Sequence, residues 1–107
     1  MTQPRIETQT IDTPRLRTFV RSAGSEGSPL LVLIHGNVSS SAFFDELLLA
    51  LADRYRVLAP DLRGFGKSER APIDATRGLR DFADDVHALL AAVAPGQRAH
   101  LLGWSVG

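Results

Sequence analysis

Residues 103–107 read Gly-Trp-Ser-Val-Gly and follow a short, mostly apolar run, Ala99 to Leu102. A serine hydroxyl is a poor nucleophile unless it is exposed, next to a base and close to an oxyanion site. A sharp turn from a strand into a helix presents a serine in this way, and small flanking residues relieve the crowding there. The spacing therefore predicts Ser105 as a catalytic nucleophile, with Gly103 and Gly107 as structural residues.

The same pattern predicts one group that would stabilise negative charge. The backbone N–H of Val106, at the start of the helix expected after Ser105, would face a developing oxyanion. Taken alone, the spacing is weak evidence, because three fixed positions in five recur by chance and the alternative is a Gly-rich turn. The upstream sequence decides between the two interpretations.

Length and composition restrict the possible classes of function. The 107 residues are enough for one small domain with a core. The 12 basic and 12 acidic residues balance, which gives no indication of binding to nucleic acid or to an anionic membrane. The sequence has no cysteine, so disulfides, thiolate metal sites and cysteine catalysis are excluded within it.

The sequence predicts neither a signal peptide over residues 1–13 nor a membrane-spanning run. Met1 to Thr13 is polar and contains acidic residues, unlike a signal peptide. The longest apolar run, Ala88 to Ala94, is too short to span a bilayer. We therefore expect a cytoplasmic protein. Because the sequence stops on the motif itself, we expect residues 1–107 to be the N-terminal portion of a single larger domain.

Five strands are expected. Ile6 to Ile11 and Leu16 to Arg21 alternate loosely and indicate two short antiparallel strands. Leu30 to Ile34 and Tyr55 to Ala59 are continuous apolar runs, which is typical of strands buried on both faces of a parallel sheet. Ala99 to Trp104 is expected to be a third buried strand of this kind.

Two helices are expected between the strands. The serines at 39–41 offer an N-cap for a largely apolar helix over Phe43 to Asp53. Apolar residues at steps of three and four from Leu79 to Val93 predict an amphipathic helix. The polar side of this helix carries Asp81, Asp84 and Asp85. The order β-β-β-α-β-α-β predicts an α/β fold, a mostly parallel sheet with helices on both faces.

Polar motifs follow the carboxyl ends of the three buried strands, the edge at which parallel sheets form sites. Residues 35–37 (His-Gly-Asn) follow the first, residues 61–68 (Asp-Leu-Arg-Gly-Phe-Gly-Lys-Ser) follow the second, and residues 103–107 the third. Three motifs in this order resemble the N-terminal part of an α/β-hydrolase, of the lid-bearing kind that includes esterases, C–C hydrolases, epoxide hydrolases and haloalkane dehalogenases. The resemblance covers essentially the whole chain.

The resemblance implies roles for the first of these motifs. In this family the residue after the His-Gly pair supplies the second oxyanion N–H, which here is Asn37, the partner of Val106. His35 and Gly36 are then structural, and His35 is expected to brace the loop rather than to act as a base. Two backbone donors aimed at one carbonyl oxygen are what acyl transfer needs.

Aromatic residues near the motifs are candidates for a substrate pocket. Trp104 and either Phe43 or Phe44 would be placed to line an acyl pocket. For the phenylalanines, packing in the core is the commoner role and remains the alternative.

Residues 61–68 also partly resemble phosphate-binding loops. The end of the run, Gly-Lys-Ser, imitates such a loop, but Asp61 stands where its first glycine is required. A dinucleotide fingerprint fails as well, because Glu69 occupies the third glycine position. We therefore predict no nucleotide binding, and we expect Asp61, Arg63 and Ser68 to hold this loop together beside the active site.

The serine at position 105 separates the subfamilies. Epoxide hydrolases and haloalkane dehalogenases carry aspartate there, so Ser105 favours esters, lactones, thioesters, amides, activated C–C bonds or acyl transfer. His100 begins the strand that leads to Ser105, about 16 Å away at its opposite end, and His87 lies on the flank of a helix. The family order is serine, acid, histidine, so both catalytic partners are expected beyond residue 107.

Together these observations predict a serine-dependent hydrolase that acts on a carboxylic ester or related acyl substrate through an acyl-enzyme. We expect a small-molecule acyl substrate as partner, and neither a metal nor an organic cofactor, nucleic acid or membrane. The alternative is an α/β-hydrolase-like protein that binds a small molecule without catalysis. The 107-residue piece by itself is expected to be inactive, and its strand Ala99–Trp104 is expected to be left as an exposed, apolar edge, because in this family another strand pairs beside it.

Overall fold

The computed structural model of this chain describes residues 5–104. Its strands are β1 (Glu7–Asp12), β2 (Arg17–Ala23), β3 (Leu30–Ile34), β4 (Arg56–Pro60) and β5 (Ala99–Gly103). Its helical segments are the 3₁₀ turn η1 (Ser41–Phe44), α1 (Asp45–Leu51), the 3₁₀ turn η2 (Ala75–Arg77) and α2 (Arg80–Val93). The predicted order of strands and helices is confirmed, with the two 3₁₀ turns added.

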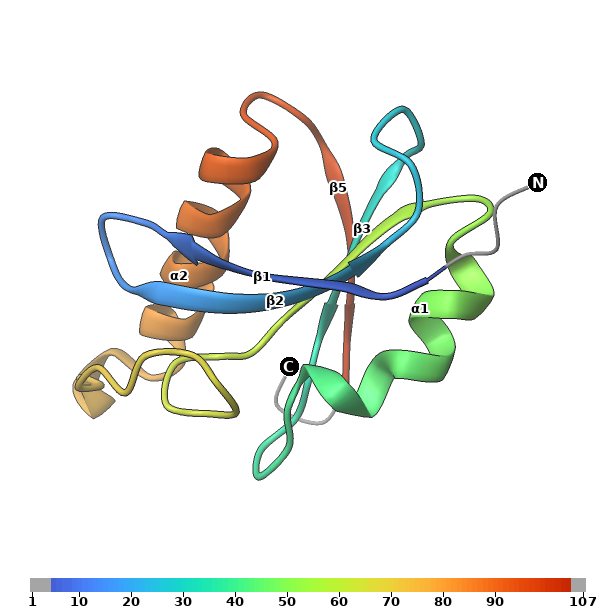
Figure 1. Ribbon diagram of the computed structural model, residues 1–107. Helices are drawn as coiled ribbons and strands as arrows, with labels where there is room; N and C mark the ends of the chain where they lie inside the picture. Colours follow the sequence, from blue (N-terminus) through green and yellow to red (C-terminus); the bar gives the residue numbers. More distant parts are fainter. Residues whose placement is uncertain (1–4, 105–107) are drawn as a thin grey trace.

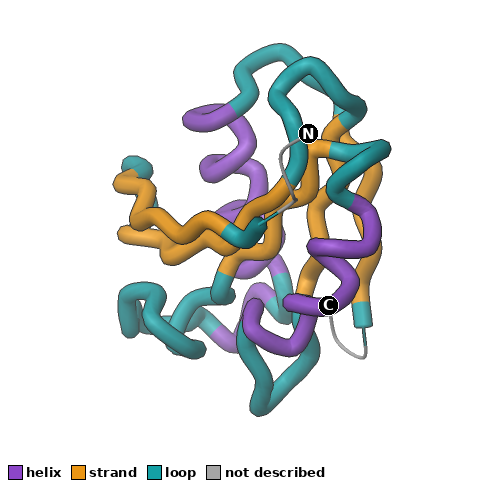
Figure 2. The backbone as a smooth tube through the Cα atoms, turned by 45° about the vertical axis from the view of Figure 1, so that its right-hand side comes forward, coloured by secondary structure: helices purple, strands orange, loops and turns teal. Residues whose placement is uncertain are grey.

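The strands form one mixed sheet in the order β1-β2-β4-β3-β5. β1 and β2 form the predicted antiparallel pair, and β2 is also antiparallel to β4. β4, β3 and β5 run parallel to one another. Helix α1 lies on one side of this sheet and α2 on the other (Figure 1), and the two helices flank the strands in the turned view as well (Figure 2). The predicted α/β class with helices on both faces is confirmed.

Each face of the sheet has its own core. Neighbouring residues of a strand point to opposite faces, and the buried residues divide accordingly. Leu33 and Val57 pack with Leu48 of α1, whereas Val32 and Leu58 pack with Leu89 of α2. This division explains why β3 and β4 are apolar without alternation, as expected for strands covered on both sides.

The first helix was predicted over Phe43 to Asp53, but α1 covers only Asp45–Leu51. The N-cap is a serine as expected: the Ser40 hydroxyl accepts a hydrogen bond from the N–H of Ala42, and the chain first makes the turn η1. At the other end, the N–H of Tyr55 donates to the carbonyl of Leu51 at 2.9 Å. Tyr55 therefore closes the end of α1, and β4 begins one residue later than predicted.

The prediction that α2 turns its three aspartates to solvent was wrong for two of them. Asp81 and Asp85 are each only 5% exposed and lie on the same stripe as the fully buried Leu89. Arginines from distant segments cover these two carboxylates, as described below, so charged groups are satisfied inside the protein. Asp84 keeps 40% of its side chain exposed, as expected for the polar side.

The prediction that β5 is a buried strand was wrong for this chain, whereas the prediction that the 107-residue piece leaves it as an exposed apolar edge is confirmed. The strand lies at the edge of the described sheet, where β3 is its neighbour. Leu101 and Leu102, which point to opposite faces, are 64% and 45% exposed. Among residues 5–104 nothing pairs with the outer edge of β5, which leaves its backbone groups and both rows of side chains uncovered.

We expect the 107-residue chain, expressed by itself, to self-associate through β5, because an open apolar strand edge pairs with other chains. Light scattering coupled to size exclusion should show a mass that rises with concentration. A variant with Leu101→Lys and Leu102→Lys places one charge on each face of the strand and should shift the chain toward monomer. A wild-type chain that stays monomeric at all concentrations would contradict this.

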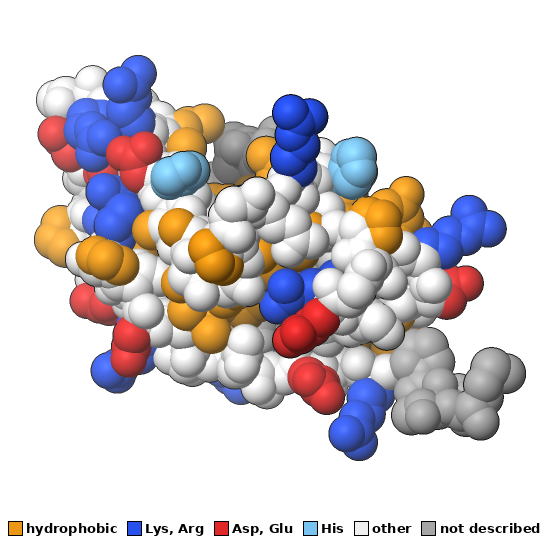
Figure 3. Space-filling model, turned by 90° about the horizontal axis from the view of Figure 1, so that it is seen from above, with side chains coloured by type: hydrophobic (Ala, Val, Ile, Leu, Met, Phe, Trp, Pro, Cys, Tyr) orange, Lys and Arg blue, Asp and Glu red, His pale blue; other side chains and the backbone are white. Residues whose placement is uncertain are grey.

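The surface carries charges of both signs. Figure 3 shows basic and acidic side chains interspersed over the visible face of the molecule, with apolar side chains between them. Within the described residues no helix has both the length and the apolar character needed to cross a membrane.

Candidate active site

The loops after β3 and β4, which carry two of the sequence motifs, lie at the end of the sheet where the parallel strands finish. The N–H of Trp104 donates to the carbonyl of Ile34 at 3.1 Å, which extends the pairing of β3 and β5 one residue beyond the end of β5. The loop after β3 starts at His35, and the loop after β4 starts at Asp61. Both loops lie at the end of the sheet where β5 finishes (Figure 1). Ser105, Val106 and Gly107 lie outside the described residues.

His35 joins the two loops. It is fully buried, and its Nε2 accepts a hydrogen bond from the N–H of Leu62 at 2.9 Å. Its Nδ1 lies 2.8 Å from the carbonyl oxygen of Gly36, so the ring proton is assigned to Nδ1. The ring also meets Phe65 edge-on, with centroids 5.4 Å apart. Both nitrogens of His35 therefore contact the backbone, and neither faces an open site.

The other two histidines lie away from this edge. His87 is on the exposed side of α2. His100 is exposed near the start of β5, the end opposite Gly103, and its ring contacts Tyr55 edge-on. Neither position places an imidazole next to residue 104.

Asp61 ties the same loops together with its side chain. The carboxylate is 3% exposed; Oδ1 accepts the N–H of Ser41 at 2.6 Å and Oδ2 accepts the N–H of Lys67 at 2.9 Å. Ser68 adds a second link, because its hydroxyl donates to the Asp61 carbonyl at 2.6 Å and accepts the N–H of Phe19 at 2.9 Å. Each carboxylate oxygen of Asp61 is thus engaged by a backbone donor of the protein.

Gly66 is shaped around the Asp61 carboxylate. Its φ is +52°, and a Cβ atom added there would lie 2.2 Å from Oδ2 of Asp61. A side chain at this position would displace the carboxylate that holds Ser41 and Lys67. In the sequence this glycine stands out only as part of a phosphate-binding pattern, and its packing role was not predicted. The available signal was the glycine that follows Asp61 five residues later in the same loop.

Arg63 fastens the loop after β4 to helix α2. Its Nε and Nη2 donate to Oδ2 and Oδ1 of Asp85, each at 2.8 Å. Arg15, from the turn between β1 and β2, donates through Nε to Oδ1 of the same carboxylate at 2.8 Å. These hydrogen bonds raise the pKa values of Arg63 and Arg15 above their usual range, against the opposing effect of burial. A fork-shaped pair of this kind fixes orientation as well as distance.

Asp81 organises the start of α2 in a similar way. Its Oδ2 accepts the backbone N–H of Asp74 at 2.8 Å, and its Oδ1 pairs with Arg77 and Arg15. The pKa of Asp81 is lowered, first because of the hydrogen bond from Asp74 and then because of the nearby arginines, which together outweigh burial. The sequence analysis missed Asp81 and Asp85 as structural residues; their spacing to Leu89, in steps of four, was the signal for a buried stripe.

The loop at Asn37 has an unusual backbone. Val38 has a φ of +56°, which is rare for a β-branched residue. Its N–H is held by the Asn37 side chain, whose Oδ1 accepts it at 3.0 Å. Asn37 is exposed, and the N–H of its own backbone has no acceptor among residues 5–104. A backbone donor is therefore presented at the edge where β5 ends.

The two aromatic residues predicted to line a pocket lie together. Phe43 and Trp104 stack with centroids 6.2 Å apart and an angle of 28° between their planes. They are 58% and 62% exposed, whereas Phe44 is buried in the core beneath α1. The stacked pair is not among the residues that line the cavity between the sheet and α2, which is described next.

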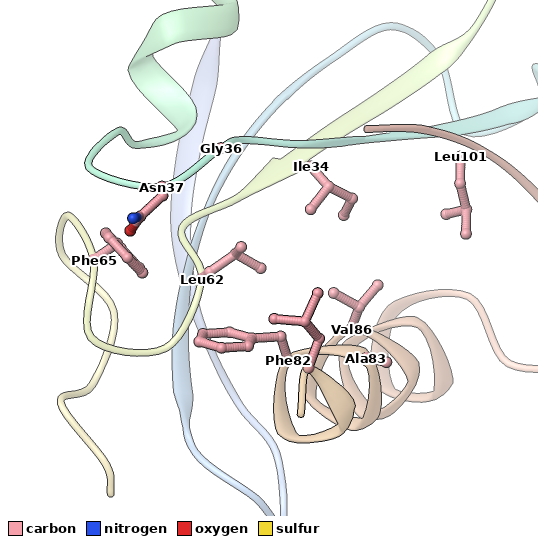
Figure 4. A pocket seen from close by; sticks show the side chains of 10 residues that line it. Ile34, Gly36, Asn37, Leu62, Phe65, Phe82, Ala83, Val86 and Leu101 are labelled. Carbon is pink, nitrogen blue, oxygen red and sulfur yellow. The ribbon is translucent and has the colours of Figure 1, made fainter. Parts of the chain in front are cut away.

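A cavity of about 520 Å³ lies between the sheet and α2. Its lining residues are Ile34, Gly36, Asn37, Leu62, Phe65, Leu79, Phe82, Ala83, Val86 and Leu101. Figure 4 shows the side chains of Ile34 and Leu101 pointing from the strands toward α2, with Asn37 at one end of the space. The walls are apolar, so the cavity suits an apolar group, and its polar end is the Asn37 loop.

Comparisons with known proteins agree with this geometry. The profile of the alpha/beta hydrolase fold family matches residues 29–107. The 2-(acetamidomethylene)succinate hydrolase of Mesorhizobium japonicum is 37% identical over 97 residues, which are 91% of this chain and 33% of that protein. The pimeloyl-[acyl-carrier protein] methyl ester esterase of Aeromonas hydrophila is 42% identical over 79 residues, 74% of this chain and 29% of that protein.

Among solved structures, an epoxide hydrolase from an endophytic Streptomyces superimposes with a TM-score of 0.83 at 29% identity. The match covers 95% of this chain and 30% of that one. The chain thus spans about a third of the length of the relatives it matches, and those relatives are hydrolases of different kinds. With the family profile, the strand order and the three motifs in agreement, this chain belongs to the α/β-hydrolase fold family.

Proposed function

We propose that this chain provides the nucleophile and the oxyanion site of a serine-dependent hydrolase that acts on a carboxylic ester or a related acyl compound. One observation carries the proposal: the hydrogen bond from the N–H of Trp104 to the carbonyl of Ile34. It fixes the residue before Ser105 beside the loop on which the backbone N–H of Asn37 has no acceptor among the described residues. A serine and a free backbone donor close together are the elements of acyl transfer.

In the proposed reaction the Ser105 hydroxyl attacks the carbonyl carbon and gives its proton to a histidine supplied by sequence beyond residue 107. The carbonyl oxygen becomes negative and accepts hydrogen bonds from the N–H groups of Asn37 and Val106. The leaving alcohol takes the proton from that histidine, and an acyl-enzyme remains on Ser105. Water, activated by the same histidine, then releases the carboxylic acid.

The choice of an acyl substrate is supported by the identity of residue 105. Serine forms acyl-enzymes readily, whereas related epoxide hydrolases and haloalkane dehalogenases use an aspartate to attack a saturated carbon. The Aeromonas relative is named as a methyl ester esterase, which is the same class of bond. We expect no metal or cofactor in this reaction, since the attacking group is a side chain.

The experiment is covalent trapping in the complete reading frame that contains this chain. A fluorophosphonate, which reacts with activated serines, should add once, to the peptide that contains Ser105, and should stop hydrolysis of a short-chain aryl ester in proportion. Heat-denatured protein is the control, because a serine without its oxyanion site does not react. Ester hydrolysis that survives complete labelling, an adduct on another serine, or no adduct at all would overturn the proposal.

A further inference from the structure

The loop that carries Asn37 is anchored at one end by Leu62 and at the other by Asp61, which are successive residues. At its start, His35 accepts the N–H of Leu62 at 2.9 Å. At its end, the N–H of Ser41 donates to the carboxylate of Asp61 at 2.6 Å. Asn37 lies between these two anchors, so the place of its backbone N–H depends on where residues 61 and 62 are held.

The backbone of the loop is strained at Val38, as expected if the two anchors fix its conformation. Val38 adopts a left-handed backbone with a φ of +56°, and it is 88% exposed, so no packing of its side chain favours that geometry. A β-branched residue keeps such a conformation when its surroundings over-determine it. Figure 4 shows Asn37, just before this residue, facing Phe65 of the loop after β4.

The loop after β4 is in turn held from helix α2. Arg63 follows Leu62 directly and makes its two hydrogen bonds of 2.8 Å to Asp85, in a pair whose side chains are 8% and 6% exposed. Arg15 approaches the same carboxylate from the β1–β2 turn. Asp85 is therefore fixed from two sides, and a continuous series of contacts leads from it through Arg63 to Leu62, His35 and the Asn37 loop.

We propose that Asp85 is a positioning residue for the oxyanion loop and acts through Arg63. The inference rests on the proposed function, because it takes the Asn37 N–H to be a donor to the oxyanion. Asp85 lies on a helix and contacts no group of the reaction. When its charge is removed, Arg63 loses its fork-shaped partner, residues 61 and 62 shift, and the N–H of Asn37 moves away from the position that the oxyanion occupies.

The first test needs no activity. In the complete protein, Asp85→Asn keeps the size of the side chain and removes its charge. Asp84→Asn is the matched control, since Asp84 is the preceding residue, is partly exposed and pairs with Arg77. Hydrogen exchange of a peptide covering residues 35–44 should become about tenfold faster in Asp85→Asn, and should change little in Asp84→Asn or in peptides from β1 and β2. Equal exchange at 35–44 in the two variants would overturn the proposal.

The second test separates positioning from a merely structural role. With an aryl ester, Asp85→Asn should lower kcat by about 10- to 100-fold while KM changes little, because a misplaced donor weakens the transition state more than substrate binding. Asp85→Glu, which keeps the carboxylate, should recover part of the loss. Faster exchange with an unchanged kcat would overturn the role in positioning.

The two tests distinguish failure of the proposed function from failure of the positioning role of Asp85. If wild-type protein shows no hydrolysis that depends on Ser105, the proposed function fails, while the exchange experiment still decides whether Asp85 holds the loop. If Asp85→Asn does not fold, Arg63→Lys takes its place, since lysine keeps the charge but cannot make the two-pronged contact. Normal exchange and normal kcat in Arg63→Lys would then overturn the inference.

Discussion

Replacing Ser105 with alanine in the complete protein is expected to lower kcat for a short-chain aryl ester by about 10⁴- to 10⁶-fold, the range seen when one member of a catalytic triad is removed. The covalent route needs the serine oxygen, and neither His35 nor Asp61, the two groups described at this end of the sheet, is placed to substitute for it. His35 is engaged by Leu62, and the Asp61 carboxylate accepts the N–H groups of Ser41 and Lys67. KM should change little, because binding of the substrate does not use the hydroxyl.

The matched control is Ser39→Ala, which makes the same chemical change on the loop after β3. It should leave kcat within about twofold of wild type if Ser105 alone is the nucleophile. Equal turnover in wild type and Ser105→Ala would remove the enzymatic interpretation. Retained binding of acyl compounds without any turnover in the wild type would instead favour the alternative of a non-catalytic binding protein.

The part of the fold that could be predicted depends on local pattern. Val32 and Leu33 are neighbours that face opposite cores, and a strand with apolar residues in both directions can be recognised from a few positions. The place of the site follows from the same pattern, because carboxyl ends of parallel strands share one edge. For that reason the sequence alone predicts that residues 35–37 and Asp61 lie at the same end of the sheet.

The part that could not be predicted depends on distant partners. Asp85 is 70 residues from Arg15 and 22 from Arg63. The four-residue spacing of Asp85 to Leu89 could indicate a buried stripe, but nothing local identifies the arginines that cover the carboxylate. β5 is the reverse case: its apolar sequence resembles that of β3 and predicts a buried strand, whereas its exposure in this chain was predicted only from the family resemblance, in which another strand pairs beside it. Periodicity within a single segment therefore decides burial for neither element.

Gly66→Ala is expected to lower the free energy of unfolding of the complete protein by roughly 2–5 kcal/mol. One part is the left-handed backbone at φ +52°, which costs an alanine about 1–2 kcal/mol. The other part is the Asp61 carboxylate, which the new methyl group would displace, because the Cβ would lie 2.2 Å from Oδ2. Buried N–H groups that lose their acceptor cost about 1–3 kcal/mol. Urea unfolding with a fixed m-value would measure the sum.

Gly64→Ala separates the two parts. Gly64 also has a positive φ, of +80°, but a Cβ there would meet nothing within 4 Å. It should therefore cost only the backbone part, about 1–2 kcal/mol. In an Asp61→Ala background the extra cost of Gly66→Ala over Gly64→Ala should disappear, since the carboxylate is gone and the two sites are coupled through it. If the two glycines cost the same in the wild-type background, the contact of Gly66 with Asp61 does not set the shape of this loop.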